Sequence, residues 1–410
     1  MVIIEDLKAL SRSQRAAFLA AFMGWALDAF DFFLLTFVIK DIAADFGAKV
    51  SDVSVAITLT LVARPIGAFL FGRLADLYGR RPVLMADVAL YSVLAIASAF
   101  APNLMVLMIL RFLFGIAMGG EWGIGASLAL ESIPPKSRGV VSGILQEGYP
   151  VGYFIAAIAN LFLPQIGWRG MLALGVIPAL LILYVRRHVE ESPSWLARRE
   201  AAHQTKGPSL IQALKGQWRR LAYVVVLMTC FNFFSHGTQD LYPTFLRVQR
   251  HFGPGMVTTL TILLNLGAVA GGLIFGTLSE RIGRRRAIVL AALLALPIIP
   301  LWAFSPTPLL LGAGAFLIQV AVQGAWGVVP AHLNELSPPD ARGTFPGFAY
   351  QLGNLFAAGN AVMQARIAES HGNNYGLALA LVCGVIAVLL AIVTWFGPEA
   401  KGRSFETGAA

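Results

Sequence analysis

The chain has 410 residues, of which 57% are hydrophobic and only 13% are charged, and its formal net charge is +9. About a quarter of the residues in an ordinary soluble domain are charged, so this composition argues against a soluble protein. The positive charge does not indicate nucleic-acid binding, because the basic residues lie between apolar segments and are not gathered with stacking aromatic residues.

The apolar segments are continuous and rich in leucine, alanine and valine, without the alternating polarity of a membrane β-barrel strand. A helix that spans a bilayer needs about 20 mostly apolar residues. Every backbone polar group in lipid also needs an internal partner, which favours helices. We predict an all-α integral membrane protein with twelve transmembrane helices near residues 17–39, 53–75, 82–101, 104–131, 140–163, 168–187, 220–246, 256–279, 286–304, 308–334, 344–367 and 375–396.

Basic residues alternate between the predicted loops. One set of loops holds most of the lysines and arginines, including Lys8 before the first helix and Lys206 and Lys215 in the longest loop. Loops rich in lysine and arginine stay in the cytoplasm. We therefore predict a multi-pass protein of the cell inner (cytoplasmic) membrane, with both termini and the longest loop in the cytoplasm.

The chain contains an internal repeat with an offset of 204 residues. Residues 72–81 match residues 276–285 in sequence pattern, the Trp-Gly pair at 122–123 recurs at 326–327, and residues 131–139 resemble residues 335–343. This repeat predicts two six-helix halves, residues 1–187 and 220–410, joined by a linker at 188–219 that contains Gly207-Pro208. Parallel repeats of this kind place the substrate site between the halves, near the middle of the membrane.

The repeated pattern Gly-x-x-x-Asp/Glu-x-x-Gly-Arg-Arg resembles the loop signature of the major facilitator superfamily, and the resemblance covers essentially the whole chain. It implies the major facilitator fold and a monomer. The acid of the pattern can bridge the arginines and a helix N-terminus, which would form a cytoplasmic latch; a basic loop that only sets the topology is the alternative. The predicted latch consists of Asp76, Arg80, Arg81, Glu131, Arg138, Glu280, Arg284, Arg285, Glu335 and Arg342.

Ionisable side chains inside membrane spans are costly, so each is a candidate for function. Asp28 and Asp31 share one face of the first predicted helix, and we expect them to carry protons or to stabilise a helix pair. Arg64 lies near the middle of the second helix, where its planar fork suits either a substrate carboxylate or a structural salt bridge to one of these acids. Glu121 is expected to relay protons or to pair with Arg111.

Three further ionisable residues lie within the predicted spans. Asp87 and His332 lie nearer the cytoplasmic ends of their predicted helices, and we expect both to belong to the latch network. Glu147 begins a stretch of the fifth predicted helix that should face the cavity.

The seventh predicted helix is unusually polar. Asn232, His236, Gln239 and Asp240 fall within about one quadrant of the helix, and His236 can share a proton with Asp240 one turn away. The pattern Asn-x-x-Ser-His-x-Thr-Gln-Asp-x-x-x-Thr resembles the signature of the fungal lactate and pyruvate permease family. That family transports monocarboxylates with protons and belongs with the sialate:proton symporters. A structural polar cluster is the alternative.

Gln351 and Asn354 in the eleventh helix resemble the Gln-x-x-Asn element of the same permeases, which lies in their translocation path; an interhelical polar clamp is the alternative. These resemblances imply proton-coupled symport of lactate or pyruvate by alternating access. The substrate would then contact Arg64, Asn232, His236, Gln239, Gln351 and Asn354, and the coupled proton would move through Asp28, Asp31, Glu121 and Asp240.

Two segments suggest other substrates. Residues 191–196 and 398–404 resemble the ends of the sixth and twelfth helices of sugar porters, so sugar acids, sialate and aromatic acids are alternatives. There is no Walker loop, metal-ligand spacing or nucleophile elbow, so we expect neither an enzyme nor a bound metal or cofactor. The expected partners are the lipid bilayer, protons and a small carboxylate, and the energy source is an ion gradient.

Overall fold

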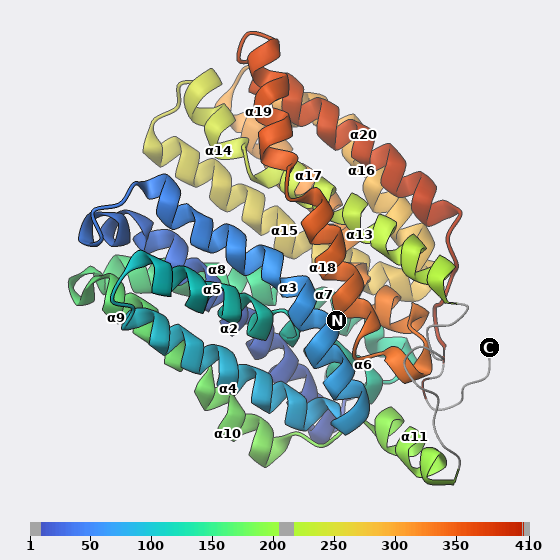
Figure 1. The fold of residues 1–410 in the computed structure, drawn as a ribbon. Coiled ribbons are helices and arrows are strands. Elements are labelled where there is room, and N and C mark those ends of the chain that lie inside the picture. The colour runs from blue at the N-terminus through green and yellow to red at the C-terminus, as the bar shows by residue number, and fades with distance from the viewer. Residues whose placement is uncertain (1–9, 205–216, 404, 406–410) are drawn as a thin grey trace.

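The computed structural model describes residues 10–204, 217–403 and 405 (Figure 1). Lys8, Lys206, Lys215 and the Gly207-Pro208 pair of the predicted linker lie outside these residues. The described chain is helical, without a strand. Its first helices are α2 (Arg12–Asp45), α3 (Val50–Tyr78), α4 (Arg80–Ala99), α5 (Leu104–Met118), α6 (Glu121–Ser132), α7 (Arg138–Gln146), α8 (Gly148–Phe162), α9 (Gly167–Ala173) and α10 (Ala179–His188).

The second part of the chain repeats this order of long helices. It contains α11 (Pro193–Gln204), α13 (Trp218–Gln239), α14 (Tyr242–Thr244), α15 (Pro254–Ile282), α16 (Arg284–Phe304), α17 (Pro308–Leu336), α18 (Phe345–Ala357), α19 (Asn360–Ser370) and α20 (Tyr375–Trp395). Short connecting turns are η1 (Pro135–Ser137), η2 (Pro164–Ile166), η3 (Leu174–Val176), the π-helical η4 (Phe245–Gln249) and η5 (Pro339–Ala341).

Ten stretches in the described part of the chain are long and apolar enough to cross a membrane as continuous helices. The pairs α7–α8 and α18–α19 supply two further crossings, each interrupted near its middle, at Glu147 and at residues 358–359. The twelve-helix architecture predicted from the sequence is therefore confirmed. The first span is longer than predicted, because the helix continues through less apolar residues to Asp45.

Within each repeat, a glycine brings the same pair of helices into close contact, α3 with α5 and α15 with α17. A Cβ atom on Gly67 of α3 would lie 1.7 Å from the carbonyl oxygen of Ile116, and one on Gly271 of α15 would lie 2.4 Å from that of Val320. Both residues of the first contact are related to those of the second by the 204-residue offset. Small residues allow such close approach where helices cannot rely on a hydrophobic driving force in lipid.

The N-terminal helices α2–α10 pack together, as do α13–α20, and the two groups meet along crossed helices (Figure 1). Helix α3 contacts α18 and the turn just before it, where Gly72 meets Gly343, and α15 contacts α7 where Gly276 meets Gly139. These two crossings lie near the same end of the long helices, so backbone contact closes the molecule there.

Candidate functional site

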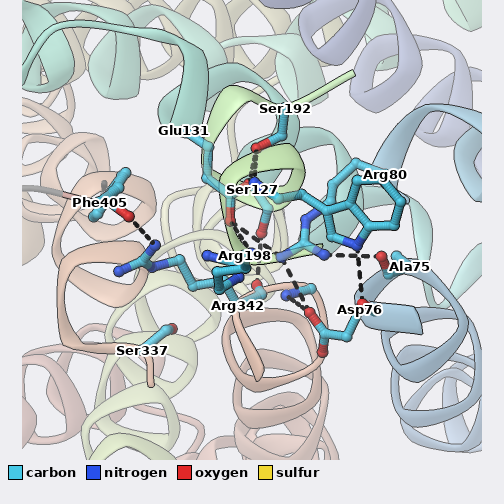
Figure 2. A network of polar contacts seen from close by, with 12 residues as sticks. Ala75, Asp76, Arg80, Ser127, Glu131, Ser192, Arg198, Ser337, Arg342 and Phe405 are labelled. Carbon is cyan, nitrogen blue, oxygen red and sulfur yellow. Dashed lines mark hydrogen bonds and ion pairs between the residues drawn. The ribbon is translucent and has the colours of Figure 1, made fainter. Parts of the chain in front are cut away.

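The first half of the predicted latch is a network around Asp76 at the end of α3 (Figure 2). The two carboxylate oxygens accept hydrogen bonds from the backbone amides of Gly343 and Thr344, at 2.7 and 3.1 Å, just before α18 begins. Asp76 also lies 3.1 Å from the guanidinium of Arg80, which in turn pairs with Glu131 at 3.1 Å. Asp76 thus joins an arginine of its own repeat to the N-terminus of a helix in the other repeat, where a negative charge is stabilising.

The second half of the latch repeats this arrangement at positions 204 residues further along the chain. Glu280 at the end of α15 accepts a hydrogen bond from the Gly139 amide in the first turn of α7 and lies 2.9 Å from Arg284. Arg284 donates two hydrogen bonds to Glu335, at 2.9 and 3.0 Å. Because each acid caps a helix of the opposite repeat, the two networks hold the N-terminal and C-terminal helices together on this side.

Arg81 and Arg285 make no ion pair with the latch acids in the described chain, which corrects their expected place. Arg81 donates to the carbonyl oxygen of Arg186 at 2.6 Å, and Arg285 donates to that of Trp395. Adjacent residues on a helix point about 100° apart, so the second arginine of each pair cannot follow Arg80 or Arg284 into the network.

Two glutamates outside the predicted latch hold its helices in place. Glu191 accepts hydrogen bonds from the Arg80 and Arg81 amides, and Glu399 does the same for Arg284 and Arg285. Burial acts to raise the pKa of Glu399, but hydrogen bonds from backbone amides, those of Arg285 and Lys401 first, outweigh it and hold this pKa below its usual value. The segments resembling sugar porters were the sequence signal for these residues.

Helix α11 adds further groups to the first network that the sequence reasoning missed. Arg198 lies 3.7 Å from Glu131, and the Ser192 hydroxyl just before the helix donates to the same carboxylate (Figure 2). This helix lies in the predicted linker, so part of the linker is a structural component of the latch.

Phe405 near the C-terminus lies between two repeat-related arginines of the latch. The guanidinium carbons of Arg138 and Arg342 lie 3.5 and 4.1 Å from its ring centroid, and the ring is 5% exposed. Arg342 also donates to the Phe405 carbonyl oxygen at 3.3 Å (Figure 2). The ring therefore connects one arginine from each repeat.

We expect replacement of Phe405 by leucine to loosen the latch while keeping an apolar side chain in place. Each cation–π contact is worth about 0.5–2 kcal/mol, and leucine loses both. Thiol labelling of Ser337→Cys, a buried position two residues after the latch acid Glu335, should therefore become several-fold faster in the Phe405→Leu background. The Phe405→Tyr variant keeps an aromatic ring and should label at the parent rate; equal rates for the leucine variant would contradict the bridging role.

Arg64 lies in the middle of the molecule, 2% exposed, and makes no ion pair within the described chain. Its Nη2 atom donates to the Met118 sulfur at 2.9 Å, its guanidinium carbon lies 5.1 Å from the Phe32 ring centroid, and Nε has no hydrogen-bond partner. Its charge acts on Asp28, yet no carboxylate lies within 4.0 Å, so the alternative of a direct salt bridge is wrong for this conformation.

Three of the four acids predicted to carry protons, all except Asp240, are buried in the N-terminal helices. Asp28 and Asp31 are 1% and 2% exposed, and Glu121 is completely buried. The expected pair of Glu121 with Arg111 does not form, because the charge of Arg111 acts on Asp31 instead. Both Glu121 oxygens lack a hydrogen-bond partner.

The three remaining ionisable residues, Asp87, His332 and Glu147, lie in different surroundings. Asp87 makes no latch contact, which corrects our expectation; instead, the like charges of Asp28 and Glu121 repel it. His332 is buried with no hydrogen bond on either ring nitrogen, so it is not bonded to the latch acid Glu335. Glu147 is buried at the break between α7 and α8, against Gly272 of α15. Helix spacing alone could not distinguish these surroundings.

His236 and Asp240 form a pair that opens into a cavity. The His236 Nδ1 and Asp240 Oδ1 atoms are 3.1 Å apart, and the two side chains are 43% and 35% exposed. Asn354 of α18 lines the same cavity. The cavity has a volume of about 200 Å³ and lies between α3, α13 and α18, with Thr58 among its lining residues. The pair predicted from sequence is therefore accessible to water and to a small solute.

The other polar residues of this set are not gathered at that cavity. Asn232 donates to the Met228 carbonyl of its own helix at 2.8 Å, and Gln239 donates to Gln319 of α17 at 3.3 Å. Gln351 is 2% exposed, with its Oε1 atom unpartnered. The four polar residues expected to share one face of α13 therefore do not meet at one cavity, because the side chain of Gln239 reaches α17 on another side of the helix.

An aromatic cluster that we did not predict as a site lies beside Arg64. Tyr350 lies 4.8 Å from Trp122 and 5.7 Å from Trp326, and Trp25 lies 5.1 Å from Tyr149, between ring centroids. The field of Arg64 acts on both tyrosines, and that of Asp240 acts on Tyr149. Tyr149 therefore interacts electrostatically with both the Arg64 region and the histidine cavity. The tryptophans repeated at 122 and 326 were the signal in the sequence.

Comparison with known proteins identifies the family. The model of the Major Facilitator Superfamily matches residues 21–359 and 225–410. The chain belongs to this superfamily. A probable 4-methylmuconolactone transporter of Cupriavidus pinatubonensis is 30% identical to it, covering 97% of this chain and 94% of the relative. The sialic acid transporter NanX of Escherichia coli is 29% identical, covering 98% of each chain.

The fold of this facilitator matches solved structures of the superfamily. The proton:xylose symporter XylE, bound to 6-bromo-6-deoxy-D-glucose, superposes with a TM-score of 0.78, covering 96% of this chain and 98% of XylE. At 20% sequence identity this likeness concerns the fold alone. The protein is thus a multi-pass membrane transporter of the major facilitator type, and its relatives are transporters rather than enzymes.

Proposed function

We propose that the protein is a proton-coupled symporter of small organic monocarboxylates, with lactate and pyruvate as its substrates. The observation that carries this proposal is Arg64, a buried guanidinium near the middle of the membrane without a carboxylate partner. A buried guanidinium without a carboxylate in direct contact is costly, so such a residue marks a binding site for an opposite charge. A substrate carboxylate would supply the missing partner through a planar, bidentate contact.

The histidine cavity provides the remaining contacts. The wall of this cavity that faces α3, the helix of Arg64, holds three polar groups. These are the His236 imidazole, which can carry a proton, the Asp240 carboxylate and the Asn354 amide. We propose that they bind the hydroxyl or keto group of the acid and exchange the coupled proton, with Asp28, Asp31 and Glu121 as further carriers. Asn232, Gln239 and Gln351 contact the substrate only after the helices rearrange, since they bond elsewhere or are buried in this conformation.

Transport would proceed by alternating access between the halves 1–187 and 220–410, with 188–219 as their linker. The conformation described here has its latch closed, with Asp76 and Glu280 each capping a helix of the opposite half. Opening breaks these contacts and exposes the site to the latch side, which we propose is the cytoplasm. A monocarboxylate that moves with one proton carries no net charge, so the membrane potential does not oppose its uptake. One chain contains the complete site, so we propose that the monomer transports.

A sugar acid, sialate or an aromatic acid is the second candidate substrate. The aromatic cluster beside Arg64, formed by Trp25, Trp122, Tyr149, Trp326 and Tyr350, favours a larger body behind the carboxylate. The relatives named as transporters of 4-methylmuconolactone and sialic acid agree with an organic acid of this size.

The test is uptake into proteoliposomes of four labelled acids: L-lactate, pyruvate, N-acetylneuraminate and benzoate. We expect lactate and pyruvate to accumulate when the outside is more acidic, and a protonophore to abolish the accumulation because it removes the driving force. Protein-free liposomes measure the passive entry of the neutral acids. Accumulation of sialate or benzoate alone would replace the monocarboxylate substrate by the second candidate. If a folded preparation accumulates none of the acids, or does so without the proton gradient, the symport proposal is wrong.

A further inference from the structure

The N-terminal helices enclose more buried acids than buried bases. Four carboxyl groups come from α2, α4 and α6, and two guanidinium groups come from α3 and α5. Their exposed fractions are 1% for Asp28, 2% for Asp31, 0% for Asp87, 0% for Glu121, 2% for Arg64 and 1% for Arg111. The cluster lies away from the latch ion pairs and away from the histidine cavity.

These acids are almost without partners. Both carboxyl oxygens of Asp31, Asp87 and Glu121 lack a hydrogen bond, as does one oxygen of Asp28. No ion pair within 4.0 Å involves any of the four in the described chain. A carboxylate that is buried without a partner is several kcal/mol too unstable to persist, so such a group keeps a proton.

Charge balance then sets the number of protons. Two guanidinium groups can compensate at most two of the four carboxylates. The positive charge of Arg64 favours the ionised form of Asp28, and that of Arg111 favours the ionised form of Asp31. These two carboxylates are therefore the ones whose charge is compensated. Asp87 and Glu121 remain; each is repelled by the other and by Asp28, although the field of Arg64 also reaches Glu121. Like charges in a dry site cannot all ionise, which leaves two protons on Asp87 and Glu121.

Tyr91 provides an independent observation at the same place. Its side chain is completely buried, its hydroxyl has no hydrogen-bond partner, and it interacts electrostatically with all four acids. A hydroxyl both donates and accepts, so it can pass a proton between carboxyl groups. Asp87 is one helical turn from Tyr91 on α4 and about 10 Å along the helix from the latch residue Arg80, at 1.5 Å per residue.

We propose that Asp87 is the proton-release residue of the transporter, which rests on the proposed symport function. In the latch-closed state, Asp87 and Glu121 hold two protons. When the latch opens, water reaches Asp87, its O–H bond breaks and the water takes the proton. Tyr91 then gives its hydroxyl proton to Asp87 and receives the proton of Glu121, so charge and atoms balance. Asp28 then takes up the coupled proton that enters with the substrate and passes it to Glu121, so Glu121 regains its proton and Asp28 returns to its ionised form.

Infrared spectroscopy tests the stored protons without any substrate. In purified protein at neutral pH, protonated carboxylic acids show a carbonyl stretch that carboxylates lack. We expect Asp87→Asn and Glu121→Gln each to remove part of this band. Asp41→Asn, an exposed acid near the end of α2, should leave it unchanged. A band unaltered by Asp87→Asn would overturn the assignment of a stored proton to Asp87.

Transport tests the release step in proteoliposomes with labelled L-lactate, or with the acid of the panel that the wild type accumulates. Asp87→Asn should lose gradient-driven accumulation by about 100-fold, the usual contribution of a proton-transfer group, while exchange of labelled for unlabelled acid continues. Asp87→Glu should retain accumulation because it keeps a carboxyl group. Normal accumulation in Asp87→Asn, or equal loss in Asp87→Glu, would overturn the proposal. A wild type without proton dependence would instead refute the symport function, and the infrared band would still decide whether Asp87 stores a proton.

Discussion

Replacement of Arg64 by glutamine should lower gradient-driven uptake of the transported acid by about 30-fold to several thousand-fold. Truncation of one partner in a buried, hydrogen-bonded charge pair costs about 2–5 kcal/mol, and each 1.4 kcal/mol is a factor of ten in affinity. The guanidinium is 2% exposed and has no carboxylate partner of its own, so no protein group replaces the lost contact to the substrate. Initial rates at several substrate concentrations would measure the effect.

Two matched variants show whether shape or charge is responsible. Arg64→Lys keeps the charge but loses the planar fork, so its affinity should fall between those of the wild type and Arg64→Gln. Arg73→Gln removes a half-buried arginine from the latch end of the same helix and should leave substrate affinity unchanged. If Arg64→Gln transports with the wild-type KM, the carboxylate binds elsewhere, and the His236–Asp240 cavity becomes the first candidate.

The second large effect concerns the buried ion pair of the latch. Arg284 and the side chain of Glu335 are fully buried, and two hydrogen bonds of 2.9 and 3.0 Å join them. Replacement of Glu335 by leucine leaves a buried guanidinium with only the partly exposed Glu280 beside it. We expect the free energy of unfolding to fall by about 3–5 kcal/mol, measured by denaturant titration in detergent with tryptophan fluorescence.

A double variant separates the loss of an ion pair from the loss of packing. Arg284→Met combined with Glu335→Leu removes both charges and fills the space with apolar atoms, so it should recover most of the stability lost in Glu335→Leu. Asp340→Ala, at an exposed position of the following turn, should unfold like the wild type. If the double variant is as unstable as the single variant, the cost does not come from the unpaired charge.

The sequence alone determined the architecture of this transporter and the identity of most polar groups within it. Twelve long apolar segments leave the backbone no alternative to helices in lipid, and the 204-residue repeat can be found without any structure. The His236–Asp240 pair was also predictable, because residues four apart on a helix are neighbours. These features depend on spacing along one segment.

Only the tertiary structure decided which distant groups meet. Arg111 acts on Asp31 rather than on Glu121, and Asp87 belongs with the buried acids instead of the latch. The contact of Phe405 with two arginines joins residues more than 60 positions apart, and no pattern within one segment encodes it. Helix spacing determines the face on which a side chain lies, but the neighbour on that face depends on how twelve helices pack. That packing arises from close glycine contacts and from the balance of buried charges.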